Sequence, residues 1–65
     1  MAYWMLCEKI GADWSPLFGD HDKSVVEFEQ QDVRDHGTPA KHLKIVKCER
    51  ATNKAIKDAI DEIKD

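Results

Sequence analysis

The segment of residues 42–48, with the sequence HLKIVKC, constrains the fold of this chain more than any other. Side chains alternate between the two faces of a strand, so Leu43 and Ile45 point one way while Val46 and Cys48 point the other. Apolar side chains on both faces are typical of a strand inside a sheet. We therefore expect the segments before and after this strand to pack against it.

The size and composition of the chain limit what it can form. Its 65 residues predict one domain over residues 1–65, and a chain this short buries only roughly 60% of its unfolded surface. Hydrophobic residues make up 42% and charged residues 35%, which suits a small core under a soluble surface. No apolar run approaches the ~20 residues of a membrane span, and the first residues lack the basic region of a signal peptide. We expect a soluble cytoplasmic protein.

Two strands are predicted in the first third of the chain. Residues 2–10 are compatible with a strand and begin with aromatic residues. Residues 11–13 form a turn of hairpin length, and residues 14–18 follow as a second, short strand. Pro16 cannot donate to a β-ladder, so this strand belongs at a sheet edge. Trp14 and Phe18 are four positions apart, which predicts that they share a face of the sheet.

The ends of residues 22–36 favour a helix. Asp22 or Ser24 is a suitable N-cap, and Ser24 with Glu27 has the spacing of a capping box. Gly37 fits the position just after a helix C-terminus, and Pro39 follows at the usual distance. We interpret this segment as a helix because both end signals are present.

The interior of the same segment agrees less well with a helix. At about 100° per residue, its apolar residues share one broad arc: Val25, Val26, Phe28 and Val33. Glu29, Asp32 and His36 fall in that arc too. Val26, Phe28 and Gln30 also alternate as in a strand, so a strand remains the alternative.

The last helix has the clearest pattern. Thr52 or Asn53 is a suitable N-cap, and apolar residues then follow at helical spacing: Ile56, Ala59, Ile60 and Ile63. The chain is thus predicted as an α+β domain of order β-β-α-β-α. We expect a mainly antiparallel three-stranded sheet in the order 2-1-3, with both helices on one face.

No complete catalytic, cofactor or metal motif is present. The candidate metal ligands, which show no CxxC or HxxxH spacing, are Cys7, His21, His36, His42 and Cys48. His42 and Cys48 share a strand face but lie ~20 Å apart, too far for a nucleophile and its base. The glycines are isolated, so no phosphate loop is formed. We predict a protein that is not an enzyme, with reduced cysteines and neither metal nor cofactor.

Charge is unevenly distributed along the chain. Residues 1–37 carry three basic and eight acidic groups, whereas residues 38–65 carry seven basic and five acidic groups. The acidic residues of the predicted first helix cluster as candidate partner-binding residues: Asp22, Glu27, Glu29, Asp32 and Asp35. They favour a non-enzymatic protein-binding module, an adaptor or inhibitor that meets a basic surface of a larger protein. Small acidic proteins of phages and mobile elements act in this manner. The sequence identifies neither the partner nor whether the protein is a monomer or a homodimer.

The alternative is a weak nucleic-acid-binding domain. Its candidate contacts lie around the third strand: Lys41, Lys44, Lys47 and Arg50. The candidate stacking residues are Tyr3, Trp4, Trp14 and Phe18. The net charge of −3 disfavours this interpretation, because nucleic-acid binders usually carry a basic excess. Lys44 and Lys47 are also predicted on opposite strand faces, which divides the basic residues.

Overall fold

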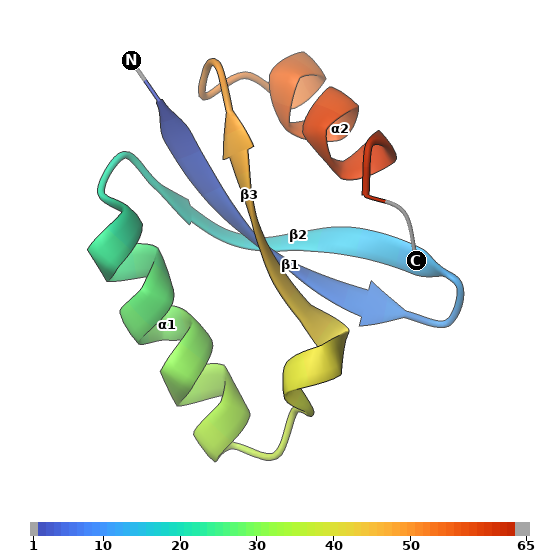
Figure 1. The fold of residues 1–65 in the computed structure, drawn as a ribbon. Coiled ribbons are helices and arrows are strands. Elements are labelled where there is room, and N and C mark those ends of the chain that lie inside the picture. Colours follow the sequence, from blue (N-terminus) through green and yellow to red (C-terminus); the bar gives the residue numbers. More distant parts are fainter. Residues whose placement is uncertain (1, 64–65) are drawn as a thin grey trace.

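The computed structural model describes residues 2–63 and contains three strands and two helices in these residues (Figure 1). In chain order they are β1 (Tyr3–Ile10), β2 (Asp13–Asp20), α1 (Lys23–Asp35), the 3-10 turn η1 (Ala40–His42), β3 (Leu43–Cys48) and α2 (Asn53–Asp61). The predicted order β-β-α-β-α is confirmed. Neither α1 nor α2, the two α-helices of this part of the chain, is long and apolar enough to cross a membrane.

The sheet has the predicted order β2-β1-β3, and both pairings are antiparallel. β1 is therefore the central strand, and β3 is an edge strand rather than a strand inside the sheet. Its apolar residues on both faces have a different cause, namely that both faces of the sheet are covered. Pro16 lies in β2 at the other edge, as predicted, where its missing N–H leaves no unpaired position inside the sheet.

The two helices cover opposite faces, and the expectation that both cover one face is wrong. α1 contributes to a cluster in which the buried residues are Leu6, Val26 and Leu43. α2 packs on a second cluster in which the buried residues are Met5, Cys7 and Cys48. Since Leu6 and Cys7 are neighbours in β1, these clusters lie on different sides of the sheet. In Figure 1, β3 runs in front, with α1 on one side of it and α2 on the other.

A β-bulge in β2 changes which residues share a face. Leu6 pairs with Phe18, but Cys7 pairs with Pro16, so Leu17 is an extra residue. The extra residue reverses the alternation, and Trp14 consequently joins the cluster under α2 while Phe18 joins the one under α1. The prediction that Trp14 and Phe18 share a face is therefore wrong.

The end signals of α1 are both used. The Asp22 carboxylate accepts hydrogen bonds from the backbone N–H of Ser24 (2.9 Å) and from its hydroxyl (2.6 Å). Gly37 follows the helix with a φ of 110°, a conformation that suits glycine. These contacts stabilise the helix over the strand that the alternating residues suggested.

Only part of the predicted apolar arc of α1 faces the sheet. Val26 is completely buried, and Val33, two turns later, packs against the same cluster. Val25 is 41% exposed and Phe28 is 78% exposed, because the helical rotation carries both of them away from the sheet. The predicted arc was too broad.

α2 forms as predicted, with the Thr52 hydroxyl accepting a hydrogen bond from the Ala55 N–H (3.2 Å). Its apolar side packs on the cluster of Met5, Cys7 and Cys48, yet none of its own residues is fully buried. Ile60 is typical, with a side chain that is only half-buried. α2 thus covers its face of the sheet less completely than α1 does.

Candidate interaction surfaces

The outer face of α1 is made of exposed residues directed away from the sheet, and besides Ser24 and Gln31 it contains Val25, Glu27, Phe28, Asp32 and Asp35. On a helical wheel, Phe28 and Asp35 lie opposite the buried Val26. The other members flank them. Three of the five predicted partner-binding residues are therefore brought together on one exposed face, with an aromatic side chain in their midst.

The other two predicted residues, Asp22 and Glu29, lie elsewhere. Asp22 caps the helix. Its carboxylate accepts hydrogen bonds from the Ser24 hydroxyl and from the Ser24 backbone N–H, and these bonds lower its pKa. Its oxygens are thus already engaged in holding the helix start. Glu29 is half-buried on the side of the helix nearer the sheet.

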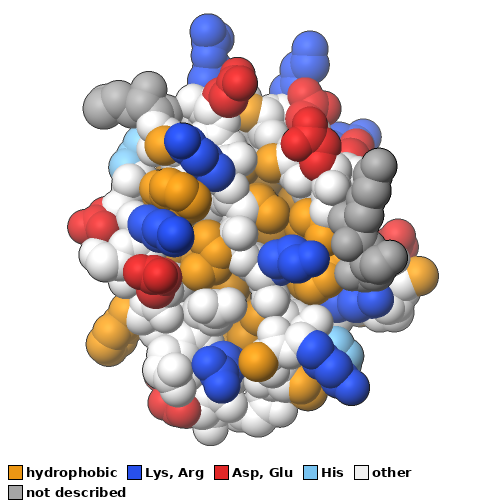
Figure 2. Space-filling view, viewed as in Figure 1, with side chains coloured by type: hydrophobic (Ala, Val, Ile, Leu, Met, Phe, Trp, Pro, Cys, Tyr) orange, Lys and Arg blue, Asp and Glu red, His pale blue; other side chains and the backbone are white. Residues whose placement is uncertain are grey.

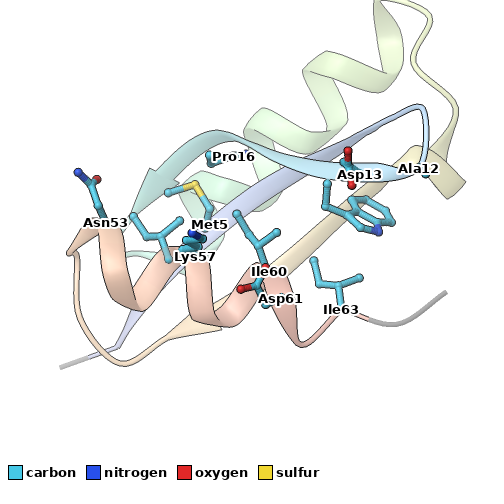
Figure 3. A pocket seen from close by; sticks show the side chains of 11 residues that line it. Met5, Ala12, Asp13, Pro16, Asn53, Lys57, Ile60, Asp61 and Ile63 are labelled. Atoms are coloured by element: carbon cyan, nitrogen blue, oxygen red, sulfur yellow. The ribbon is translucent and has the colours of Figure 1, made fainter.

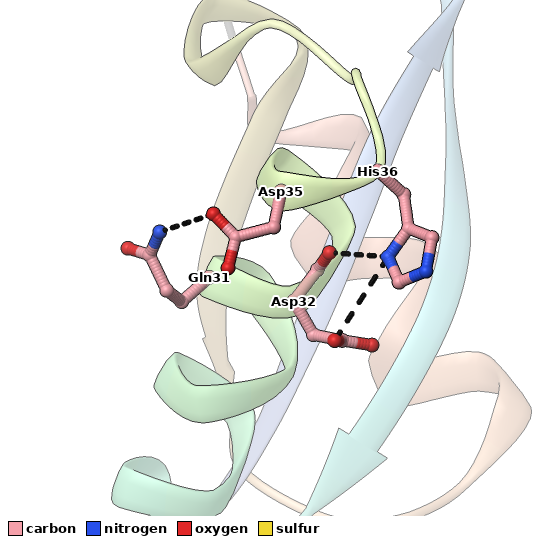
Figure 4. A network of polar contacts seen from close by, with 4 residues as sticks. All are labelled: Gln31, Asp32, Asp35 and His36. Atoms are coloured by element: carbon pink, nitrogen blue, oxygen red, sulfur yellow. Dashed lines mark hydrogen bonds and ion pairs between the residues drawn. The ribbon is translucent and has the colours of Figure 1, made fainter.

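A small polar network closes the C-terminal end of the outer face (Figure 4). His36 Nδ1 donates to the carbonyl oxygen of Asp32 (2.8 Å) and lies 3.9 Å from its carboxylate. The Gln31 side-chain amide donates to Asp35 (3.0 Å). The pKa of His36 is raised by the Asp32 carbonyl, then by the Asp32 carboxylate and the charge of Asp35. His36 was missed as part of this surface, although its spacing of four residues from Asp32 was visible in the sequence.

The basic residues of the alternative hypothesis are divided between the two faces of the sheet. Lys44 pairs with Cys7 and its ammonium lies 5.4 Å from the Trp14 ring centre, on the α2 side. Lys47 pairs with Trp4 and its ammonium lies 5.8 Å from that ring, on the α1 side. Lys41 belongs to η1 and Arg50 follows β3, so both lie beyond the ends of the strand.

Each tryptophan is also approached by a second lysine. Lys23 lies 4.9 Å from the Trp4 ring centre, and Lys9 lies 6.0 Å from the Trp14 ring centre. These are cation–π distances. A nucleic-acid base would have to displace ammonium groups in order to stack on either ring, so these contacts favour a structural role for both tryptophans.

The two cysteines are buried and reduced members of one cluster. Cys7 is 0% exposed and Cys48 is 1% exposed, and both are free thiols. Burial, together with a smaller effect of Cys48, raises the pKa of Cys7 to about 11, and burial also raises the pKa of Cys48. Such thiols are poor nucleophiles at neutral pH. Within residues 2–63, no group of three or more His, Cys, Asp or Glu side chains is placed to hold a metal ion.

An open groove of about 750 Å³ lies between α2 and the β1–β2 hairpin (Figure 3). Its apolar lining comes from both elements: Met5, Trp14, Pro16, Ile56, Ile60 and Ile63. Asp13, Lys57 and Asp61 add charged groups of both signs. The groove results from the incomplete cover that α2 gives the sheet. The sequence predicted the apolar side of α2 but gave no signal for how closely this helix would pack.

Comparisons with protein families, with curated proteins and with solved structures found no match to this chain.

Proposed function

We propose that this domain is a non-enzymatic protein-binding module, an adaptor or inhibitor, that docks the outer face of α1 on a basic surface of a larger protein. The observation that carries the proposal is the 78% exposure of Phe28 in the middle of a capped helix. Burial of such a side chain is worth about 1.5–3 kcal/mol, which the isolated domain leaves unused.

The composition of this face resembles that of protein interfaces. Binding energy at interfaces concentrates in a few aromatic or large apolar anchors that enter a pocket and are surrounded by a polar rim. Phe28 with its neighbour Val25 supplies the anchor, and Asp32 and Asp35 supply the rim. A helix that presents anchors at this spacing suits a groove on its partner.

The negative charge of the rim residues defines the chemistry of the partner. Glu27, Asp32 and Asp35 are all exposed, so the expected partner has an apolar pocket bordered by lysine or arginine. A basic groove that normally holds nucleic acid has this character. The acidic face itself would repel nucleic acid, and the division of Lys44 and Lys47 between two sheet faces gives nucleic-acid binding less support.

The test is affinity capture from the source cells with three forms of the protein. The wild type and Ile10→Ala should retain the same partner, whereas Phe28→Ala should lose it. Ile10 is the matched control because it is apolar and 61% exposed but lies at the end of β1, outside this face. Circular dichroism should show that all three are equally folded. Equal retention of the partner by Phe28→Ala would exclude this face as the contact surface.

A further inference from the structure

The outer edge of β3 is a continuous unpaired strand edge. β3 is the last strand of the sheet, and no backbone–backbone hydrogen bond within residues 2–63 joins its outer side to another element. Its pairing with β1 runs without a register shift from Leu43 to Cys48. An edge of this kind exposes a row of N–H and C=O groups that can accept a further strand.

The opposite edge of the sheet differs in both respects. β2 contains Pro16, which has no N–H, and the bulge at Leu17 interrupts its pairing pattern. Proline and bulges are the devices by which proteins prevent strands from adding to an edge. β3 contains neither, and no glycine. Of the two edges, only β3 offers a regular template.

The side chains of β3 leave room for contacts with an added strand. Ile45 and Val46 are only half-buried, although they point to opposite, helix-covered faces. A further strand beside β3 would place its side chains next to each of them. Apolar contact would thus be gained on both faces of the sheet.

Charge selects the occupant of this edge. Lys44 and Lys47 are exposed, one toward each face, and Lys41 and Arg50 lie just beyond the two ends of the strand. Figure 2, in the orientation of Figure 1, shows Lys and Arg side chains distributed over this side of the molecule with apolar side chains between them. The ammonium groups of Lys44 and Lys47 lie over Trp14 and Trp4, and a strand with carboxylates on both faces would draw them outward into ion pairs.

The same lysines disfavour pairing between two copies of this chain. Directly opposite residues of an antiparallel pair share a face, so a symmetric pair of two β3 edges is centred on a single residue such as Ile45 or Val46. When the pair is centred on Ile45, the two Lys44 side chains are diagonal neighbours on one face, and when it is centred on Val46, the two Lys47 side chains are. Diagonal neighbours are within reach of long side chains, so these like charges disfavour the pairing. Edge lysines of this kind prevent self-association but do not prevent the addition of an acidic strand.

We infer that the outer edge of β3 is a docking site for an extended acidic segment of a partner protein, which adds to the sheet as a fourth strand. The site is independent of the outer face of α1, since it uses backbone groups and side chains of another element. The domain would therefore carry two contact surfaces of opposite sign.

The test uses end-blocked synthetic peptides and amide NMR spectra of the isotope-labelled domain. A peptide that repeats Glu-Val-Val-Glu carries glutamates on both faces of an added strand. It should shift the amide signals of residues 43–48 and slow the hydrogen exchange of the outward-facing amides. The same peptide with every second backbone nitrogen methylated should not bind, because methylation removes the donors. Equal binding of the methylated peptide would show that the contact is only electrostatic, and would overturn the inference. So would binding that shifts the signals of another element instead.

The second part of the test reverses the charge of the lysines in β3. Lys44→Glu with Lys47→Glu should weaken binding of the glutamate peptide by about tenfold or more, as expected from two reversed cross-strand pairs. The matched control is Lys54→Glu with Lys57→Glu, which changes the net charge equally on α2 and should bind as the wild type does. Sedimentation at rising concentration should show no self-association. A dimer that protects the β3 amides would assign this edge to a second copy and contradict the acidic segment.

Discussion

Leu6 and Cys7 are adjacent residues of β1, both are completely buried, and each belongs to a different core. Leu6 packs with Val26 under α1, whereas Cys7 packs with Cys48 under α2. The domain thus consists of three layers with β1 in the middle, and its two cores are both small. Neither core alone is large enough to stabilise the chain, so damage to one of them should destabilise the whole domain.

The first prediction concerns Leu6. Leu6→Ala should lower the free energy of unfolding by about 2–5 kcal/mol, the usual cost of a cavity at a fully buried leucine. A domain of this size has a total stability near the lower end of the ~5–15 kcal/mol range, so the variant should retain only about 0–3 kcal/mol and should unfold at a much lower urea concentration. Urea titration monitored by circular dichroism measures this. Leu17→Ala, at the 47% exposed bulge residue, is the control and should cost far less.

The second prediction concerns the looser core. Ile60→Asp should destabilise the domain by roughly 1–3 kcal/mol, because it places a carboxylate against the cluster of Met5, Cys7 and Cys48. The cost is limited by the half-exposed position of Ile60 beside the groove. Asp58→Ala, at an exposed position of the same helix, should change little. Equal stability of the two variants in thermal melts would mean that α2 does not dock on the sheet.

The third prediction concerns pH. The pKa of Cys7 is about 11 in the folded protein against an ordinary value of 9.0, because burial disfavours the thiolate. Between these two values the unfolded chain loses a proton that the folded chain keeps, so stability is present below pH 9.0 and falls as the pH rises toward about 11. Urea titrations across this pH range measure the decline. Cys7→Ala should reduce the slope, and an unchanged slope would mean that another group is responsible.

How far the sequence predicts this fold depends on which interactions fix each element. Asp22, Gly37 and Thr52 act within one turn of the chain, and their roles were predicted because capping is local. The bulge at Leu17 is a property of the pairing between two strands, and no residue near it indicates that β2 contains one residue more than its partner. It was therefore missed, and with it the separation of Trp14 from Phe18.

The positions of the helices show the same division. Leu43 with Ile45, and Val46 with Cys48, already placed apolar groups on both faces of β3, which requires cover on both faces. Helices on one face only would have left the apolar residues of the other face exposed, so the expectation of both helices on one face was inconsistent with this pattern. The exposure of Phe28 could not be predicted, because the apolar arc of α1 was wider than the side that the sheet can cover.

The fourth prediction concerns His36. Its pKa should lie above the ordinary histidine value, because Asp32 accepts its Nδ1–H and places a carboxylate nearby. Asp32→Asn should lower the pKa of His36 only in part, since the backbone carbonyl, which is the larger cause, remains. NMR titration of the His36 ring signals measures both values. A raised pKa also means that the stabilising contact is complete at low pH and is lost as the pH rises through that pKa.

The last prediction concerns the rim of the outer face of α1. Asp32→Lys with Asp35→Lys should leave the domain folded, because both side chains are exposed and neither caps the helix. Rim charges act mainly on association, so the double variant should bind the captured partner with a much lower association rate and a smaller change in dissociation rate. The difference from the wild type should shrink as salt is added, since salt screens the attraction between exposed charges.

The control for this measurement is Asp58→Lys with Glu62→Lys, which changes the net charge equally at exposed positions elsewhere. If both double variants slow association to the same extent, only the overall charge matters and the outer face of α1 is not the contact. If Asp32→Lys with Asp35→Lys alone is slow and Phe28→Ala instead dissociates faster, the two parts of the face have separate roles. The carboxylates would then steer the approach of the partner, and the aromatic side chain would hold the complex together.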